Sequence, residues 1–155
     1  MNMEYFRVVE AGEGIERAIL RGLTHRGKGM SGVSGSHPAL LVVSPGAAAD
    51  GLALPAACRT VLLPGDAWGL PEGLRAASAV SYGASPKNSL TVSSRRGERL
   101  WAALQRELVT VEGRVVERQE FPVPFLSHGE LASLAVAGAL LLLGVPPEEL
   151  DLQEK

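Results

Sequence analysis

The sequence predicts an α/β fold built on a mostly parallel sheet. Short, largely apolar runs at 39–43, 60–63 and 77–82 each lead into a turn with proline or glycine, the pattern of strands covered on both faces. The intervening segments 47–54 and 66–75 can form short helices or helical turns, and Asp66 is a suitable N-cap for the second. Strand, crossover and strand in this order indicate parallel neighbours.

An amphipathic helix is expected before these strands and an antiparallel section after them. In 13–23, Ile15 and Ile19 fall on one helical face, and the glycine- and serine-rich stretch 26–36 ends the helix. Segments 89–94, 100–111 and 114–121, with a turn at Glu112 and Gly113, predict a hairpin or meander. A helix over 100–108 fits the spacing of its apolar residues equally well.

The last expected elements are a helix from 128 or 129 to 143, ended by Gly144, and a short turn at 147–150. The apolar stretch 131–145 would span only about 22 Å as a helix, against a hydrocarbon core of about 30 Å, so a buried helix is expected. The first seven residues do not resemble a signal peptide, and we expect a cytoplasmic protein. Together the elements predict a three-layer, Rossmann-like sheet extended by the antiparallel section.

Composition narrows the function classes. A chain of 155 residues is expected to form a single α/β domain spanning residues 1–155. The net charge of −2 and the aromatic content of 5% argue against a nucleic-acid partner. One cysteine, Cys58, excludes a disulfide scaffold and a thiolate zinc site, and we expect no cofactor, metal ion or membrane partner.

One polar cluster follows the strand predicted at 77–82. It consists of Tyr82, Ser85, Lys87 and Asn88. Ligands of open α/β sheets bind outside the carboxyl ends of the strands, so this cluster is a candidate site for an anion or a sugar. Ser-Pro and Asn-Ser are also common turn sequences, and a turn between strands is the favoured interpretation.

Other polar residues give weaker indications. None of the three histidines has a second histidine at helical ligand spacing, and surface positions are favoured for them. Arg59 could lower the pKa of Cys58, but a small buried thiol is the favoured interpretation. The charged segments 105–107 and 117–120 predict either a solvated sheet face or an edge made for a partner chain. An exposed edge strand would allow a homodimer or another partner protein to dock.

Three segments together resemble a known family. They are Val80-Ser-Tyr-Gly-Ala-Ser85, Phe121-Pro-Val-Pro-Phe125 followed by His128, and Leu143-Gly-Val-Pro-Pro-Glu-Glu-Leu150 after an alanine-rich helix. This order resembles the second half of the central domain of Mur ligases, the ATP-dependent amide-forming enzymes of bacterial peptidoglycan synthesis. The likeness covers about residues 60–150 and implies a common fold. It also adds His128 to the weak ligand-binding candidates.

The sequence departs from this family at its nucleotide site. The segment from Gly22 to Gly29 fits Gly-x4-Gly-Lys but ends in glycine, where a P-loop needs a hydroxyl for Mg²⁺. It also begins inside a predicted helix, whereas a P-loop connects a strand to a following helix. At the later helix start, Gly129 and Ala132 stand where the family has asparagines, and only His128 matches.

These departures favour a non-catalytic domain acting in binding or assembly, although the sequence does not decide whether the chain is an enzyme. One alternative is a degenerate Mur-type amide ligase, or a ligase subunit whose missing motif comes from a partner chain. The other is a small-ligand-binding module that uses the strand ends near Tyr82 and Ser85.

Overall fold

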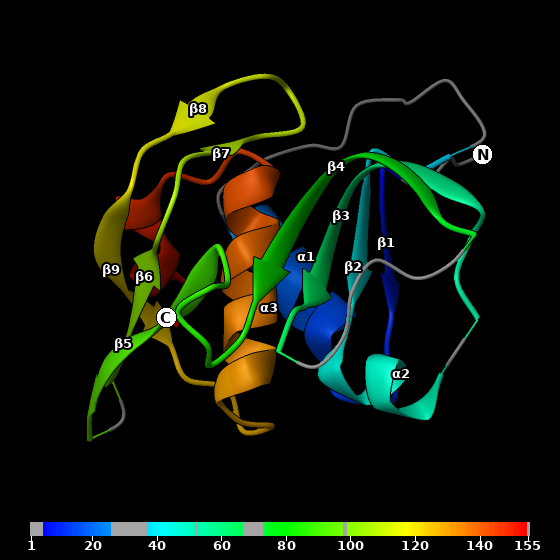
Figure 1. Cartoon of the computed structure of the whole chain (residues 1–155). Helices are drawn as coiled ribbons and strands as arrows, with labels where there is room; N and C mark the ends of the chain where they lie inside the picture. Colours follow the sequence, from blue (N-terminus) through cyan, green and yellow to red (C-terminus); the bar gives the residue numbers. More distant parts are fainter. Residues whose placement is uncertain (1–4, 26–36, 52, 67–72, 98, 155) are drawn as a thin grey trace.

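The computed structural model describes residues 5–25, 37–51, 53–66, 73–97 and 99–154, and shows an α/β fold in three layers (Figure 1). Seven strands form the main sheet in the order β1-β2-β3-β4-β5-β6-β9. Their bounds are β1 Phe6–Val9, β2 Leu40–Val43, β3 Ala57–Pro64, β4 Arg75–Tyr82, β5 Leu90–Arg96, β6 Arg99–Leu104 and β9 Gln119–Pro124. Strands β7 (Leu108–Val109) and β8 (Val115–Val116) form a separate antiparallel pair. The helices are α1 (Ile15–His25), α2 (Pro45–Asp50), α3 (Glu130–Leu142) and the 3-10 helix η1 (Pro147–Glu154).

The main sheet is parallel from β1 to β5 and antiparallel from β5 through β6 to β9. This confirms the predicted Rossmann-like sheet with its antiparallel extension. Strand β1 was missed by the sequence analysis. It is a four-residue edge strand, too short to show a pattern of its own.

Two apolar cores lie on opposite faces of the sheet. On β2, Leu40 and Val42 pack into the core that contains α1 and α3, whereas Leu41 and Val43 pack into a smaller core with Ala47 of α2. Successive side chains of a strand point to opposite faces, so α1 and α2 cover different faces. The full burial of all four β2 residues confirms the prediction of a strand covered on both sides.

Helix α3 is buried around its whole circumference, which explains its almost uninterrupted apolar sequence. Residues 132–142 are all buried. A Cβ placed on Gly138 would lie 3.1 Å from a methyl group of Leu62 and 3.3 Å from one of Leu90, so glycine permits this close approach to the sheet. No helix within the described ranges has the length and apolarity to cross a membrane.

The segment 100–108 forms no helix; its first part belongs to β6, which ends at Leu104, and Leu108 begins β7. Leu100, Ala102 and Leu104 are buried in alternation, since β6 pairs with β5 on one side and with β9 on the other. The segment 114–121, expected to belong to a hairpin or meander, is divided between two antiparallel pairs. Its first part, β8, pairs with β7, and its last part belongs to β9, which joins the main sheet and continues to Pro124.

Strand β4 also departs from expectation. Ala77, Ser78 and Ala79 are exposed, although this strand was predicted to be covered on both faces. The reason is that β4 pairs with β5 only between Tyr82 and Leu90. The first half of β4 therefore has a neighbouring strand, β3, on one side only. The helix expected at 66–75 falls largely outside the described residues, and β4 already begins at Arg75.

Candidate functional site

Several polar side chains lie at the carboxyl end of the parallel strands. Here the connections after β1 and β2 leave toward opposite faces, to α1 and α2 respectively. In open α/β sheets, such a divergence between neighbouring strands produces the crevice in which ligands bind.

Glu10 occupies the start of α1. Its two carboxylate oxygens accept hydrogen bonds from the backbone nitrogens of Ile15 at 2.8 Å and Glu16 at 3.1 Å. The first N–H groups of a helix have no partner within the helix and carry a partial positive charge, so a carboxylate is stabilised there. The chain itself fills the position at which an external anion would bind.

Glu13 occupies the crevice between β1 and β2. Its carboxylate accepts hydrogen bonds from the backbone nitrogens of Ala11 at 2.9 Å and Gly46 at 2.7 Å, and from the hydroxyl of Ser44. Partial burial alone would raise the pKa of Glu13, but these hydrogen bonds and the nearby His128 outweigh it and lower the pKa. The same residue thereby links the loop before α1 to the first turn of α2.

Asp66, which follows β3, likewise binds backbone N–H groups through its carboxylate. Its carboxylate accepts hydrogen bonds from the backbone nitrogens of Ala84 at 2.8 Å and Ser85 at 2.9 Å, and from Nδ2 of Asn88 at 2.8 Å. Partial burial raises the pKa of Asp66, and these three bonds more than compensate, so the pKa lies below its ordinary value. A side chain on Gly83 would collide with this carboxylate. The described bonds of Asp66 therefore go to the β4–β5 connection.

Of the four polar residues predicted as a cluster, Ser85, Lys87 and Asn88 lie in the turn after β4, whereas Tyr82 is the last residue of β4 and bonds to β2. Tyr82 is buried, its hydroxyl donates to the carbonyl of Val43 at 2.6 Å, and burial raises its pKa. Asn88 is also buried and donates to the carbonyl of Ser85 as well as to Asp66. Lys87 is exposed, and its backbone nitrogen donates to Ser85 Oγ. Ligand binding by these residues stays a prediction.

His128 lies elsewhere, at an open depression of about 620 Å³ beside α1. The depression is lined by Glu10, Gly12, Gly14, Glu16, Arg17, Leu20 and His128. The side chains of Glu16, Arg17 and His128 form no hydrogen bond or ion pair with another residue of the described part. Glu10, in contrast, caps α1, and His128 helps to lower the pKa of Glu13, so Glu16 and Arg17 are the charged groups of this lining that the described contacts leave unused.

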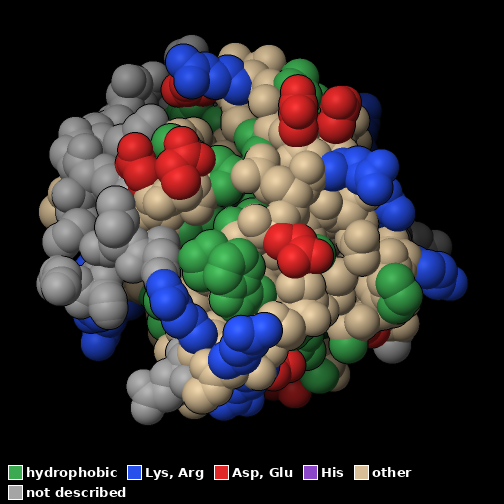
Figure 2. Space-filling model, turned by 90° about the vertical axis from the view of Figure 1, so that its left-hand side faces the viewer, with side chains coloured by type: hydrophobic (Ala, Val, Ile, Leu, Met, Phe, Trp, Pro, Cys, Tyr) green, Lys and Arg blue, Asp and Glu red, His purple; other side chains and the backbone are tan. Residues whose placement is uncertain are grey.

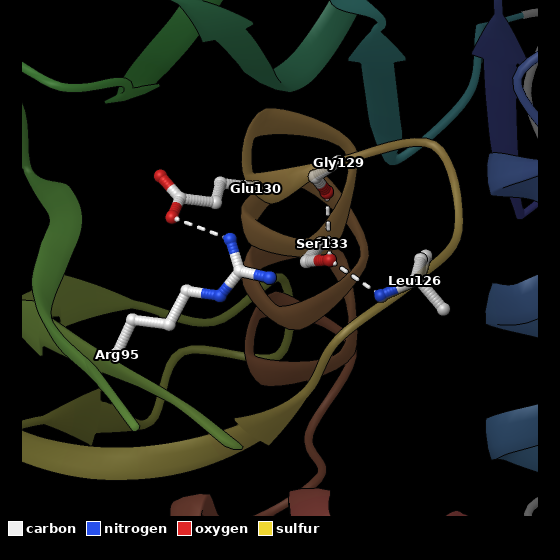
Figure 3. Close-up of polar contacts among 5 residues, drawn as sticks. All are labelled: Arg95, Leu126, Gly129, Glu130 and Ser133. Carbon is white, nitrogen blue, oxygen red and sulfur yellow. Dashed lines mark hydrogen bonds and ion pairs between the residues drawn. The ribbon is translucent and has the colours of Figure 1, made fainter. Parts of the chain in front are cut away.

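The start of α3, which carries the likeness around His128, is held by residues that the sequence analysis did not identify. Ser133 is buried; its Oγ accepts a hydrogen bond from the backbone nitrogen of Leu126 at 2.8 Å and donates to the carbonyl of Gly129 at 2.8 Å (Figure 3). Arg95 of β5 forms an ion pair with Glu130 (Figure 3), at 3.5 Å, and its guanidinium lies 4.0 Å from the ring centre of Phe125. The loop is therefore fixed to both α3 and β5.

Two further sequence hypotheses can be located. Gly22 to His25 lie inside α1, and the rest of the P-loop-like segment lies outside the described residues. Cys58 is buried, and burial raises its pKa to about 11, which confirms the buried thiol and contradicts activation by Arg59. The guanidinium of Arg59 instead donates to the carbonyl of Val111 at 3.0 Å.

The described residues do not form a metal centre. His37 and His128 are exposed there. No group of three or more His, Cys, Asp or Glu within the described ranges could hold a metal ion. No protein-family model, no curated protein and no solved structure matches the chain.

Proposed function

We propose that this chain is a non-catalytic α/β domain, related to the central domain of Mur ligases, that acts in binding or assembly. The observation that best supports the proposal is that three carboxylates accept hydrogen bonds from backbone N–H groups at the carboxyl end of the parallel strands. These carboxylates belong to Glu10, Glu13 and Asp66. The kinship itself rests on the sequence likeness of residues 60–150.

The physical reason concerns phosphate recognition. A nucleotide site at the end of a parallel strand uses free backbone N–H groups to bind phosphate oxygens. A carboxylate bonded to those groups uses the donors and also repels the phosphates. Two unit charges of like sign 4 Å apart repel by about 4 kcal/mol at the effective dielectric of a protein surface. An edge with three such carboxylates is therefore a poor site for a triphosphate.

The test is thermal unfolding with and without Mg²⁺-ATP, followed by titration calorimetry. We expect no stabilisation, whereas a bound nucleotide at a hundredfold excess over its dissociation constant would add about 2.7 kcal/mol. Saturable micromolar binding with Mg²⁺-dependent hydrolysis would overturn the proposal and favour the degenerate ligase. Hydrolysis that requires an added P-loop protein would favour a ligase subunit.

A small-ligand-binding module is the second candidate, and the depression beside α1 is the observation that favours it. Glu16 and Arg17 carry opposite charges beside that space, and His128 also lines it. A fragment screen by NMR distinguishes this site from the turn at Lys87 and Asn88, since each gives its own set of shifted amide signals. Fragments that shift neither set remove this candidate.

Assembly through a sheet edge is a separate part of the proposal. The outer edge of β9 contains Pro122 and Pro124, which have no backbone N–H and so hinder pairing with another strand. The opposite edge strand, β1, contains no proline, so we expect any strand-mediated homodimer to form there. A monomer mass from light scattering at high protein concentration would remove this expectation.

A further inference from the structure

The two-stranded sheet of β7 and β8, near the end of α3 (Figure 1), leaves two valines exposed. Val109 and Val115 lie directly opposite each other in this pair and are 50% and 57% exposed. Among the described residues, Leu20 is the only other large hydrophobic residue that is exposed. Edge strands usually carry charged residues or proline, which discourage pairing with another chain. β8 consists of two valines and has neither.

The backbone groups of Val115 point away from β7. The N–H of Thr110 donates to the carbonyl of Arg114 at 2.8 Å, so these two residues form a hydrogen-bonded pair. Such pairs alternate with non-bonded pairs along an antiparallel ladder, and the next pair, Val109 and Val115, is therefore non-bonded. The N–H and C=O of Val115 consequently face the outer edge of β8. Within the described residues β8 has no second neighbouring strand, so both groups are open to a strand from another molecule.

A groove of about 350 Å³ lies beside β8. It is lined by Val115 and Val116 of β8 and, at and beyond the end of α3, by Leu141, Val145 and Pro146, whereas neither residue of β7 lines it. This volume is at the lower end of the range for ligand pockets, so it suits one or two side chains. A strand added to the outer edge of β8 therefore has apolar surface beside it.

Charged side chains also line the groove, and they belong to Arg114, Glu117 and Glu148. None of them forms an ion pair with another described residue. Arg114 precedes β8 and Glu117 follows it, so about 10 Å separates them along the chain. Figure 2 shows the side of the molecule that carries β8 and β9, and in its upper part Asp and Glu side chains lie on either side of hydrophobic ones. The Glu117 end of the groove therefore combines negative charge with apolar surface.

We propose that the outer edge of β8 binds an extended segment of a partner protein in which a basic residue is followed by two apolar residues. The inference rests on the assembly role proposed above and adds the chemistry of the partner. In an antiparallel arrangement the basic residue lies opposite Glu117, and the two apolar residues lie opposite Val116 and Val115. The residue opposite Val115 exchanges two hydrogen bonds with it. Addition of a strand to a free sheet edge is a recurrent mode of peptide recognition.

Two other occupants fit the groove less well. Nucleic acid affinity depends on contacts of Lys and Arg with several phosphates, and the groove has one arginine against two carboxylates. A second copy of the chain that paired through its own β8 would bring another Glu117 to the same edge, and like charges oppose such an association.

The probe is a short fluorescein-labelled peptide with the order threonine, lysine, isoleucine, isoleucine, threonine, compared with the same peptide carrying glutamate in place of lysine. We expect the lysine peptide to bind the full chain, with an affinity that falls as salt is added. Glu117→Lys should weaken that binding about fivefold and strengthen binding of the glutamate peptide, because the sign of the local charge is reversed. Fluorescence anisotropy measures both affinities.

Methylation of the peptide backbone tests strand pairing without changing the protein. The second isoleucine lies opposite Val115, and a methyl group on its nitrogen removes a hydrogen-bond donor and blocks close approach to β8. We expect this peptide to bind about tenfold more weakly or worse. The same methyl group on the first isoleucine points away from β8, so that peptide should keep its affinity within about twofold.

Glu16→Lys is the matched control, since it makes the same charge change elsewhere. Glu16 lies with His128 near the start of α3, whereas the groove lies near its end, and the 13 residues of α3 span about 20 Å. No binding of the lysine peptide, equal binding of the lysine and glutamate peptides, an equal loss in Glu16→Lys, or equal losses for the two methylated peptides would each overturn the inference. So would tighter binding of oligouridylate, or a stable dimer that the peptide dissociates. These outcomes are independent of the nucleotide titration, so the inference and the proposed function can fail separately.

Discussion

The carboxylate of Glu13 accepts a hydrogen bond of 2.7 Å from the backbone nitrogen of Gly46, although 33 residues separate the two along the chain. This contact joins the loop after β1 to the helix after β2, and these two connections lie on opposite faces of the sheet. A side chain on Gly46 would contact the same carboxylate, so the two residues fit closely. The backbone N–H of Gly46 is thus already bonded to a carboxylate of the protein itself.

We expect Glu13→Ala to lower the free energy of unfolding by about 1–3 kcal/mol, since it leaves the N–H of Gly46 without its charged acceptor. Glu13→Gln keeps an acceptor oxygen and should lose less. Glu16→Ala is the control, because its side chain makes no hydrogen bond to another described residue, and we expect a change within about 0.5 kcal/mol. Urea unfolding measures all three. Equal effects at the two positions would contradict the role given to Glu13.

Stability should decrease in acid because of Glu13 and Asp66. Both have a folded-state pKa below the ordinary values of 4.5 and 3.8. As the pH falls through those values, the unfolded chain takes up protons that the folded chain still excludes, so the free energy of unfolding declines. At pH values above these ordinary pKa values, the two carboxylates make their full contribution to the free energy of unfolding. Urea unfolding at a series of pH values should show a shallower decline below the ordinary pKa values in the double variant Glu13→Gln and Asp66→Asn. An unchanged slope would mean that other carboxyl groups cause the acid sensitivity.

The hydroxyl of Tyr82 gives a third prediction. It is buried and donates at 2.6 Å to the carbonyl of Val43, so Tyr82→Phe removes one hydrogen bond without removing the ring. We expect a loss of about 1–2 kcal/mol in the free energy of unfolding, because the carbonyl of Val43 loses this buried donor. Tyr5→Phe is the control at a partly buried tyrosine with no hydroxyl hydrogen bond to another described residue. A loss at Tyr5 as large as that at Tyr82 would contradict the explanation.

Much of the fold could be predicted because its central strands are continuous apolar runs. β2 is buried on both faces and α3 around its circumference, and both show this in their sequences. The segment around Leu100, Leu104 and Leu108 could not be assigned, since residues four apart share a face in a helix and also in a strand. Pairing of β6 with β5 and β9 decided it. The separation of β8 from β9 likewise depends on pairing partners that no local pattern contains.

The candidate site was harder to predict, because its acceptors bond to backbone atoms far along the chain. Glu10 is the exception, since it bonds to the start of a helix that begins only five residues further along the chain. Asp66 was predicted to cap the helix that followed it, but its carboxylate reaches the backbone of Ala84 and Ser85. The sequence shows the donor and acceptor types but not which loops the sheet brings together.

The contacts of Ser133 predict how the loop before α3 is held. Ser133→Ala removes the acceptor for the backbone nitrogen of Leu126 and the donor to the carbonyl of Gly129. We expect a loss of about 1–3 kcal/mol in the free energy of unfolding, since both groups bond to a buried hydroxyl. Hydrogen exchange gives the sharper readout, because the amide of Leu126 should lose protection while amides in the middle of α3 keep theirs. Ser127→Ala is the control on an exposed serine of the same loop. If the Leu126 amide exchanges equally fast in the wild type and in Ser133→Ala, the hydroxyl does not hold the loop, and the position of His128 must depend on Arg95 and its contacts with Phe125 and Glu130 instead.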